Sequence, residues 1–352
     1  MSVNSISSST VSSILQNTVT RLQSQLTTVS SESSTGLLAD IGFSLGANSG
    51  QDVALHQQMA DLTALTGSNA VVTAQLGSAS AALTSLSSTT QTMLEQIIQN
   101  QSETPGSNGA LALQQTAAGA LSTFSSLMNT STGGVYVFGG VNSGVAPIAQ
   151  YAQTPAGAAQ TAVDAAFQAT FGFPITSASV STISGAAMTS FLNTQFAGLF
   201  SGAAWTSTWS SASDTATSDR IGASETATTS ISANQAAFQN TAQALTMLSE
   251  FGGLNLSSDA TAALMTAAQK TMTAANNGLI QAGAAVGAMQ NQVTQANSAI
   301  SLQQNILTSQ INGNETVNTY DVASQVSALT TQLQTAYSLT AQIAKLSLVN
   351  FL

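Results

Sequence analysis

Few side chains of this chain belong to the types that carry out catalysis or bind metal ions. Its 352 residues include one histidine, no cysteine, 14 acidic and only 4 basic residues. Without cysteine, disulfide and thiolate chemistry are excluded. The single histidine, His56, has no second histidine and no cysteine with which to share a metal ion. We therefore predict no metal site and interpret His56 as a structural or solvated residue.

The carboxylates are scattered and suggest no catalytic set. Those at Asp52, Asp61, Glu95 and Asp259 have the positions of helix-surface or capping residues. Asp214 and Asp219 form a loose pair, but no nearby residue would raise a pKa there or act as a nucleophile.

The paired glycines do not form a phosphate-binding loop. No lysine of the P-loop type follows residues 133–134 or 139–140, and no G-x-S-x-G nucleophile turn occurs. We therefore predict that the protein is not an enzyme and has no cofactor.

Two long segments carry apolar residues at alternating spacings of three and four, which places them on one seam of a supercoiled helix. The first seam is Leu55, Leu62, Leu65, Val72, Leu76, Ala79, Leu83, Leu86, Met93 and Ile97. The second is Met265, Ala268, Met272, Ala275, Leu279, Ala282, Val286, Met289, Val293, Ala296, Ile300 and Leu307. Polar Gln58, Asn69 and Thr90 interrupt the first seam, where single polar residues usually fix the register.

Shorter helices with the same spacing are predicted at both ends of the chain. The first spans residues 5–30, and a glycine-rich loop follows at residues 31–51. The last follows a turn at residues 312–314 and ends in the apolar residues 346–352, either capping the protein's own core or entering the core of an oligomer. Assembly residues are expected on these stripes: Leu15, Leu22, Leu26, Leu329, Leu333, Ile343, Leu346, Leu348, Phe351 and Leu352.

The middle of the chain has a mixed pattern. A β-branched and aromatic run at residues 135–138 is closed by two glycines, and short strands or turns are predicted at residues 165–169 and near Ile183. We expect a domain junction at Tyr136, Phe138, Gly139 and Gly140. Trp205 and Trp209 are the expected anchors of the middle domain.

The predicted fold is mainly α, a long antiparallel coiled-coil or helical bundle of N- and C-terminal segments with an inserted small, mainly-β middle domain.

The amino-acid composition favours a protein that assembles with other subunits over one that stays monomeric. Only 5% of residues are charged, whereas an average soluble domain is about a quarter charged. The net charge of -10 disfavours binding to nucleic acids and to anionic membranes. No basic residue precedes an apolar run at the N-terminus, so no cleaved signal peptide is predicted, and no apolar stretch is long enough to span a bilayer.

Several segments resemble the flagellin superfamily of bacterial axial proteins. Residues 320–323, 329–337 and 346–352 resemble its C-terminal signature, and residues 286–292 resemble an upstream segment. Residues 134–143, followed by Pro147, resemble the hook–filament junction proteins (flagellar hook-associated protein 3). Residues 36–42, 50–53 and 196–200, with Trp205 and Trp209, resemble the alphaproteobacterial form of that family.

This resemblance implies a three-part organisation and a set of partners. Residues 1–35 and 315–352 would form a terminal helical core domain, residues 36–132 and 228–314 a coiled-coil domain, and residues 133–227 an outer domain. The protein would pass unfolded through type III export, with an export chaperone, to the extracellular flagellum. There it would form a ring of copies between hook-associated protein 1 and flagellin. Filament flagellin is the first alternative, and a self-associating coiled-coil adhesin or secreted effector is the second.

Overall fold

The computed structural model describes residues 8–101, 103–152 and 156–349, and it is mainly helical, as predicted. The chain divides into two compact units. The terminal unit comprises residues 1–63 and 301–352, and the central unit comprises residues 64–300. Two long helices, α3 (Ser49–Gln99) and α9 (Ser258–Glu315), contribute residues to both units.

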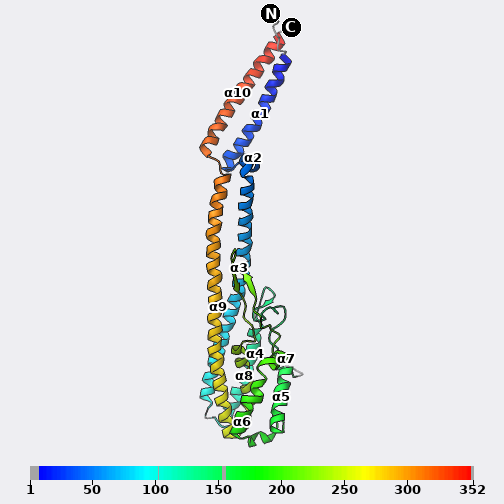
Figure 1. Ribbon diagram of the computed structural model, residues 1–352, viewed down its shortest axis with the longest axis vertical. Helices are drawn as coiled ribbons and strands as arrows, with labels where there is room; N and C mark the ends of the chain where they lie inside the picture. The colour runs from blue at the N-terminus through cyan, green and yellow to red at the C-terminus, as the bar shows by residue number, and fades with distance from the viewer. Residues whose placement is uncertain (1–7, 102, 153–155, 350–352) are drawn as a thin grey trace. The chain divides into compact units, whose positions relative to one another are not determined.

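The terminal unit is built around a helix from each end of the chain. Helices α1 (Ser8–Thr35) and α10 (Thr319–Val349) lie side by side (Figure 1). Leu22 on α1 and Ala336 on α10 are buried, and the Gln23 Nε2 donates a hydrogen bond of 2.6 Å to the Tyr337 hydroxyl. The two predicted terminal helices therefore pair with each other.

The two connections predicted in this unit differ from the structure. The expected loop at residues 31–51 is mostly helical, because α1 runs on to Thr35 and α2 (Ile41–Leu45) follows. The Asp40 Oδ1 accepts a 2.9 Å hydrogen bond from the Phe43 N–H, which caps α2. The turn expected at residues 312–314 is also wrong, because α9 continues to Glu315. A glycine inside a helix costs only about 1 kcal/mol, which the burial of Ile311 on the same turn offsets.

The heptad pattern locates the buried faces of the long helices. Every residue of the first predicted seam is buried, and so is every residue of the second except Met289, which is half-buried. Gln58, which we expected at a seam position, is exposed.

Polar pairs join α3 and α9 within the central unit. The Asn69 Nδ2 donates to the Asn297 Oδ1 at 2.7 Å, and the Asn276 Oδ1 accepts from the Thr90 Oγ1 at 3.2 Å. Numbers rise along α3 as they fall along α9, so the helices are antiparallel, as predicted. Asn69 and Thr90 are fully buried, as expected of residues that fix the register.

Two further helices of the central unit, α4 (Asn108–Met128) and α8 (Ala236–Phe251), pack against each other. Ser107 caps α4 by accepting from the Ala110 N–H at 3.2 Å. For α9 the capping residue is Ser257, directly before the first helical residue, and its Oγ accepts from the Ala260 N–H at 3.2 Å.

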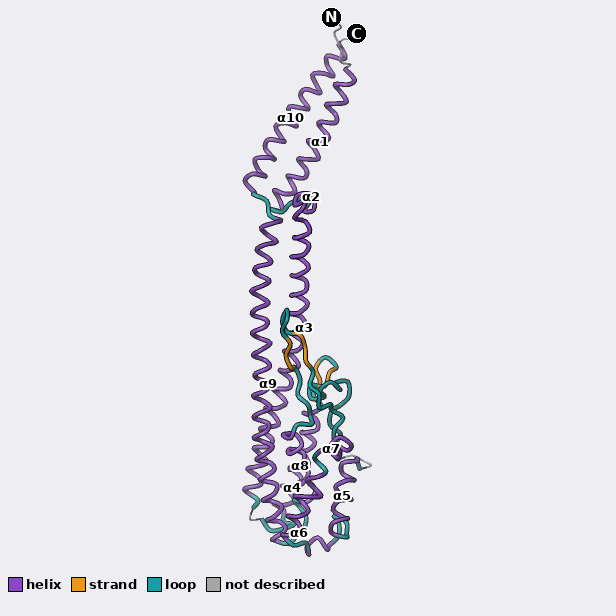
Figure 2. Tube along the Cα trace, in the orientation of Figure 1, coloured by secondary structure: helices purple, strands orange, loops and turns teal. Residues whose placement is uncertain are grey.

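The middle of the chain contains two small antiparallel hairpins, shown in orange in Figure 2. The first joins β1 (Ser131–Thr132) to β2 (Val135–Tyr136). Its turn residues Gly133 and Gly134 both have positive φ, as a tight two-residue hairpin turn requires. The second joins β3 (Ser218–Arg220) to β4 (Thr226–Thr228). This is the small β region that the sequence predicts.

The same stretch also holds helices that the pattern did not separate: α5 (Ala158–Phe171), α6 (Gly185–Phe191) and α7 (Gly202–Thr208). Residues 165–169, predicted as a strand or turn, lie in α5. Val163 and Phe167, one helical turn apart, are both buried, and the alanines between favour a helix. Short apolar runs of this kind fit either element.

An aromatic cluster fixes these helices to the rest of the central unit. Phe167 of α5 lies 5.7 Å from Phe191 of α6 and 5.6 Å from Phe251 of α8, measured between ring centroids. Trp205 and Trp209 stack at 5.6 Å and are both buried, so the predicted anchors are part of this core.

Candidate functional site

The predicted assembly residues on α1 and α10 are only partly covered within one chain. Leu22 is buried, but five others keep intermediate exposure: Leu15, Leu26, Leu329, Leu333 and Ile343. Two helices packed only against each other leave part of each apolar stripe open. The terminal unit therefore presents apolar side chains that the packing within a single chain does not bury completely.

Other large apolar side chains of the terminal unit are more exposed still. Phe43 keeps 87% of its surface and Tyr320 keeps 82%. The others that the structure describes on the same unit are Ile14, Leu37, Val53, Leu302, Ile306, Tyr337 and Leu339. Extended apolar exposure on a protein with few charges is typical of a surface that contacts other proteins.

The last predicted assembly residues cannot be placed. Phe351 and Leu352 lie outside the described residues, and so do the side chains of Leu346 and Leu348, although their backbone belongs to α10. Their role stays a prediction.

The end of α9 is tied to the chain that follows α1. The Leu38 N–H donates to the Glu315 carbonyl at 2.8 Å, and the Val317 N–H donates to the Gly36 carbonyl at 3.0 Å. Leu37 and Thr316 form an isolated antiparallel bridge between them. These backbone bonds hold Glu315 in a fixed position.

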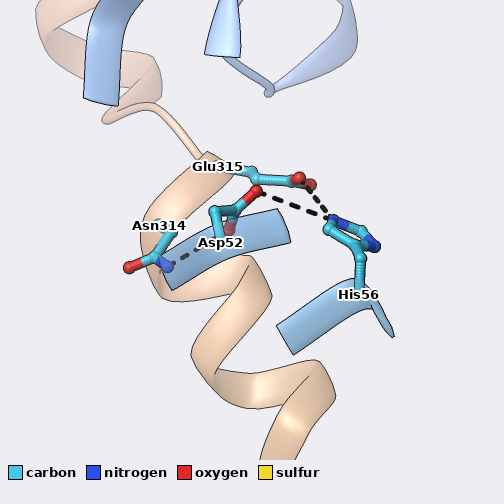
Figure 3. A network of polar contacts seen from close by, with 4 residues as sticks. All are labelled: Asp52, His56, Asn314 and Glu315. Carbon is cyan, nitrogen blue, oxygen red and sulfur yellow. Dashed lines mark hydrogen bonds and ion pairs between the residues drawn. The ribbon is translucent and has the colours of Figure 1, made fainter. Parts of the chain in front are cut away.

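A polar cluster surrounds Glu315 and joins α9 to the start of α3 (Figure 3). The His56 Nε2 lies 2.8 Å from the Glu315 Oε1 and 3.8 Å from the Asp52 Oδ2. The Asn314 Nδ2 donates to the Asp52 Oδ1 at 3.2 Å. The two carboxylates thus face one imidazole nitrogen from different helices.

The two carboxylates of this cluster are largely buried, which strengthens their electrostatic interaction with His56. The Asp52 side chain is 5% exposed and that of Glu315 13% exposed, whereas the His56 side chain is 52% exposed. Across the ranges that the structure describes, this is the one group of three side chains able to ligate a metal ion together, with ligand atoms within 4.8 Å of one another.

Sequence reasoning missed this cluster because Glu315 is 259 positions from His56. The antiparallel register of the two seams was the available signal, because it places the start of α3 opposite the end of α9.

The predicted junction residues of the central unit are firmly packed. Phe138 is fully buried and meets Phe238 of α8 edge to face at 5.5 Å, while Tyr136 is half-buried. The Phe138 carbonyl accepts from the Ala233 N–H at 2.8 Å. Segment 135–138 therefore connects the end of α4 to the start of α8.

The two glycines that follow occupy positions where a side chain would collide. Gly140 has a φ of +60°, and a Cβ there would lie 2.6 Å from the carbonyl oxygens of Ser213 and Thr215. A Cβ at Gly139 would lie 2.9 Å from the Asn142 carbonyl oxygen. The crowding explains why glycine occupies both positions.

A second group of titratable residues lies in the central unit. Burial raises the pKa of Glu250, and the negative charge of Asp164 acts in the same direction. Burial also raises the pKa of Tyr151, with a further contribution from the Glu250 carboxylate. Among the residues that the structure describes, the Tyr151 hydroxyl has no hydrogen-bond partner of normal geometry, although that carboxylate is near enough to affect its ionisation.

Among the helices that the structure describes, none combines the length and apolar character needed to cross a membrane.

Two family models match the chain, one at each end. Residues 6–143 match the bacterial flagellin N-terminal helical region, and residues 269–352 match the bacterial flagellin C-terminal helical region. Together these matches cover more than half of the chain and include α1, α3, α10 and most of α9. No curated protein matches the chain.

Proposed function

This chain belongs to the flagellin superfamily, and we propose that within that family it is the adapter between hook and filament. Family membership assigns a structural role in the bacterial flagellum, with self-assembly and an extracellular location. The finer assignment is that a ring of copies contacts hook-associated protein 1 on one side and flagellin on the other. An export chaperone would accompany the chain before assembly.

The observation that carries the proposal is segment 134–143, whose sequence resembles that of junction proteins. Phe138 on Phe238, together with the confined backbone at Gly140, makes this segment the anchor between the helical part and the middle of the chain. A segment held this tightly would set how the middle residues are presented to a neighbouring subunit.

The partly covered stripes of α1 and α10 support the mode of assembly. Half-buried Leu26 and Leu333 would become buried against neighbouring copies, with a gain of about 25 cal/mol for each Å² of apolar surface removed from water. We propose that the terminal core domain is residues 1–35 and 315–352, that residues 36–132 and 228–314 form the coiled-coil domain, and that residues 133–227 face outward.

Immunogold labelling of isolated flagella tests this assignment. An adapter is expected to label one position, between hook and filament, whereas labelling along the filament would contradict the proposal and favour filament flagellin. Hooks isolated from a strain without the gene provide the control for the antibody.

The deletion strain gives a second, independent readout. Loss of an adapter leaves hooks without filaments while flagellin is released into the medium. Loss of the filament protein itself leaves no released flagellin, which would support the alternative.

A further inference from the structure

We propose that Asp52, His56 and Glu315 form a binding site for a divalent transition metal ion of the Zn²⁺ type, which fastens the start of α3 to the end of α9. The sequence alone led us to predict no metal site, because no second histidine and no cysteine accompanies His56. The inference is independent of whether the protein is an adapter or a filament subunit.

The ligand set fits such an ion by type and charge. One imidazole nitrogen with two carboxylate oxygens suits Zn²⁺ and its neighbours, whereas Mg²⁺ and Ca²⁺ prefer oxygen ligands alone. Two carboxylates neutralise the two positive charges of the ion. The half-exposed His56 leaves room for water to complete the coordination.

The distances also fit after a small adjustment. Metal–ligand bonds of about 2.0–2.2 Å in a tetrahedral site separate the ligand atoms by about 3.3 Å. The His56 Nε2 lies 2.8 Å from the Glu315 oxygen and 3.8 Å from the Asp52 oxygen. These two separations lie on either side of the required value, and the three ligand atoms all lie within 4.8 Å of one another, so side-chain rotations would bring them to a common metal ion.

The negative charge gathered at the site favours the binding of a cation. Two largely buried carboxylates converge here, and within the described residues neither forms an ion pair with a lysine or arginine. Glu315 is the last residue of α9, where the partial negative charge of a helix C-terminus opposes a carboxylate. Both unfavourable effects are relieved by a bound divalent cation.

The surrounding contacts orient the ligands. The Asn314 amide holds the Asp52 carboxylate from the side away from His56 (Figure 3). The Leu38 N–H bond to the Glu315 carbonyl fixes the backbone that carries the third ligand. Partners of this kind commonly change metal affinity by about 10–100-fold.

The single histidine makes the test direct. In a long-range ¹H–¹⁵N spectrum of the full chain, freed of any histidine tag, the imidazole signals belong to His56 alone. Addition of Zn²⁺ is expected to shift the Nε2 resonance strongly and to saturate at one ion per chain. A His56 signal that an excess of Zn²⁺ leaves unmoved would overturn the proposal.

Amino-acid substitutions distinguish Zn²⁺ binding at these three residues from nonspecific binding to surface carboxylates. Glu315→Gln and His56→Asn should each weaken Zn²⁺ binding, measured by calorimetry, by more than about tenfold. Asp61→Asn removes an exposed carboxylate of α3, the helix that carries His56, and it should leave the affinity for Zn²⁺ unchanged. Equal affinity in wild type and Glu315→Gln, or equal loss in Asp61→Asn, would show that the three residues do not form one site.

The fastening role has its own readout. The Leu38 amide, which is bonded to the Glu315 carbonyl, should exchange its hydrogen more slowly when Zn²⁺ is bound. In His56→Asn the added metal should have no effect on that exchange. Zn²⁺ that binds His56 without slowing Leu38 would show that the ion does not hold α9 in place.

Discussion

Gly140 offers a sharp test of how segment 134–143 is held, through the change Gly140→Ala. A Cβ at this position would lie 2.6 Å from two backbone carbonyl oxygens, which cannot rotate away as a side chain would. The backbone must shift, and two hydrogen bonds are endangered: Val141 N–H to the Thr215 carbonyl and Ser213 N–H to the Gly139 carbonyl, both 3.0 Å.

The magnitude follows from these parts. A left-handed backbone costs a residue with a Cβ about 1–2 kcal/mol, and each weakened hydrogen bond adds about 0.5–1.5 kcal/mol. We therefore expect Gly140→Ala to lower the free energy of unfolding of the central unit by about 2–5 kcal/mol.

Two neighbouring glycines separate the contributions. Gly134 has a φ of +82° but open space around a Cβ, so Gly134→Ala should cost only the left-handed term of about 1–2 kcal/mol. Gly144 has neither positive φ nor close neighbours, so Gly144→Ala should change stability by less than about 0.5 kcal/mol.

Urea unfolding followed by tryptophan fluorescence measures the loss of stability of the central unit. The chain has two tryptophans, Trp205 and Trp209, and both are buried in the central unit. If Gly140→Ala and Gly144→Ala unfold at the same urea concentration, the crowding at Gly140 does not exist in solution and the reasoning fails.

Three further outcomes are expected. Glu250→Gln should stabilise the protein at neutral pH, because burial raises the pKa of Glu250, so that its ionised form opposes folding. Wild-type stability should rise as the pH falls through that raised pKa toward 4.5, and urea midpoints of the two proteins should converge there; a gap independent of pH would contradict this. Removing residues 349–352 should block assembly, with a loss of about 1.5–3 kcal/mol per large apolar side chain, and truncated protein that still joins hooks to filaments in electron micrographs would refute it. In the purified monomer, hydrogen exchange should be faster in α1 and α10 than in the central unit, since these two helices pack mainly against each other and keep partly exposed stripes; protection at Leu22 or Leu333 as strong as at Leu76 would count against a role of assembly in stabilising them.

The sequence predicts the long helices well, because a heptad repeat sustained over many turns is specific to long helices packed along one seam. All ten residues predicted for the first seam are buried, and both register-fixing residues Asn69 and Thr90 bond across to α9. The pattern failed where the segments are short. In α2 a single capping bond from Asp40 outweighs a glycine-rich composition, and in α5 an apolar run of helical length resembles a strand.

The functional residues divide in the same way. Leu22 and the junction residue Phe138 are found by their periodicity or their aromatic context, and both are buried. The cluster of Asp52, His56 and Glu315 depends on which turns of α3 and α9 lie opposite each other, and no local pattern carries that information.

The buried amides and hydroxyls between α3 and α9 have a mechanical consequence. If one helix slid past the other by a heptad, apolar residues would still meet apolar residues, but Asn69 and Thr90 would lose Asn297 and Asn276 together. Thr90 would keep its bond to the Ser87 carbonyl within α3, whereas Asn69 would lose one of the two acceptors of its buried amide, at a cost of about 1–3 kcal/mol. The shifted register is therefore less stable than the native one, and the polar contacts oppose sliding of α3 along α9.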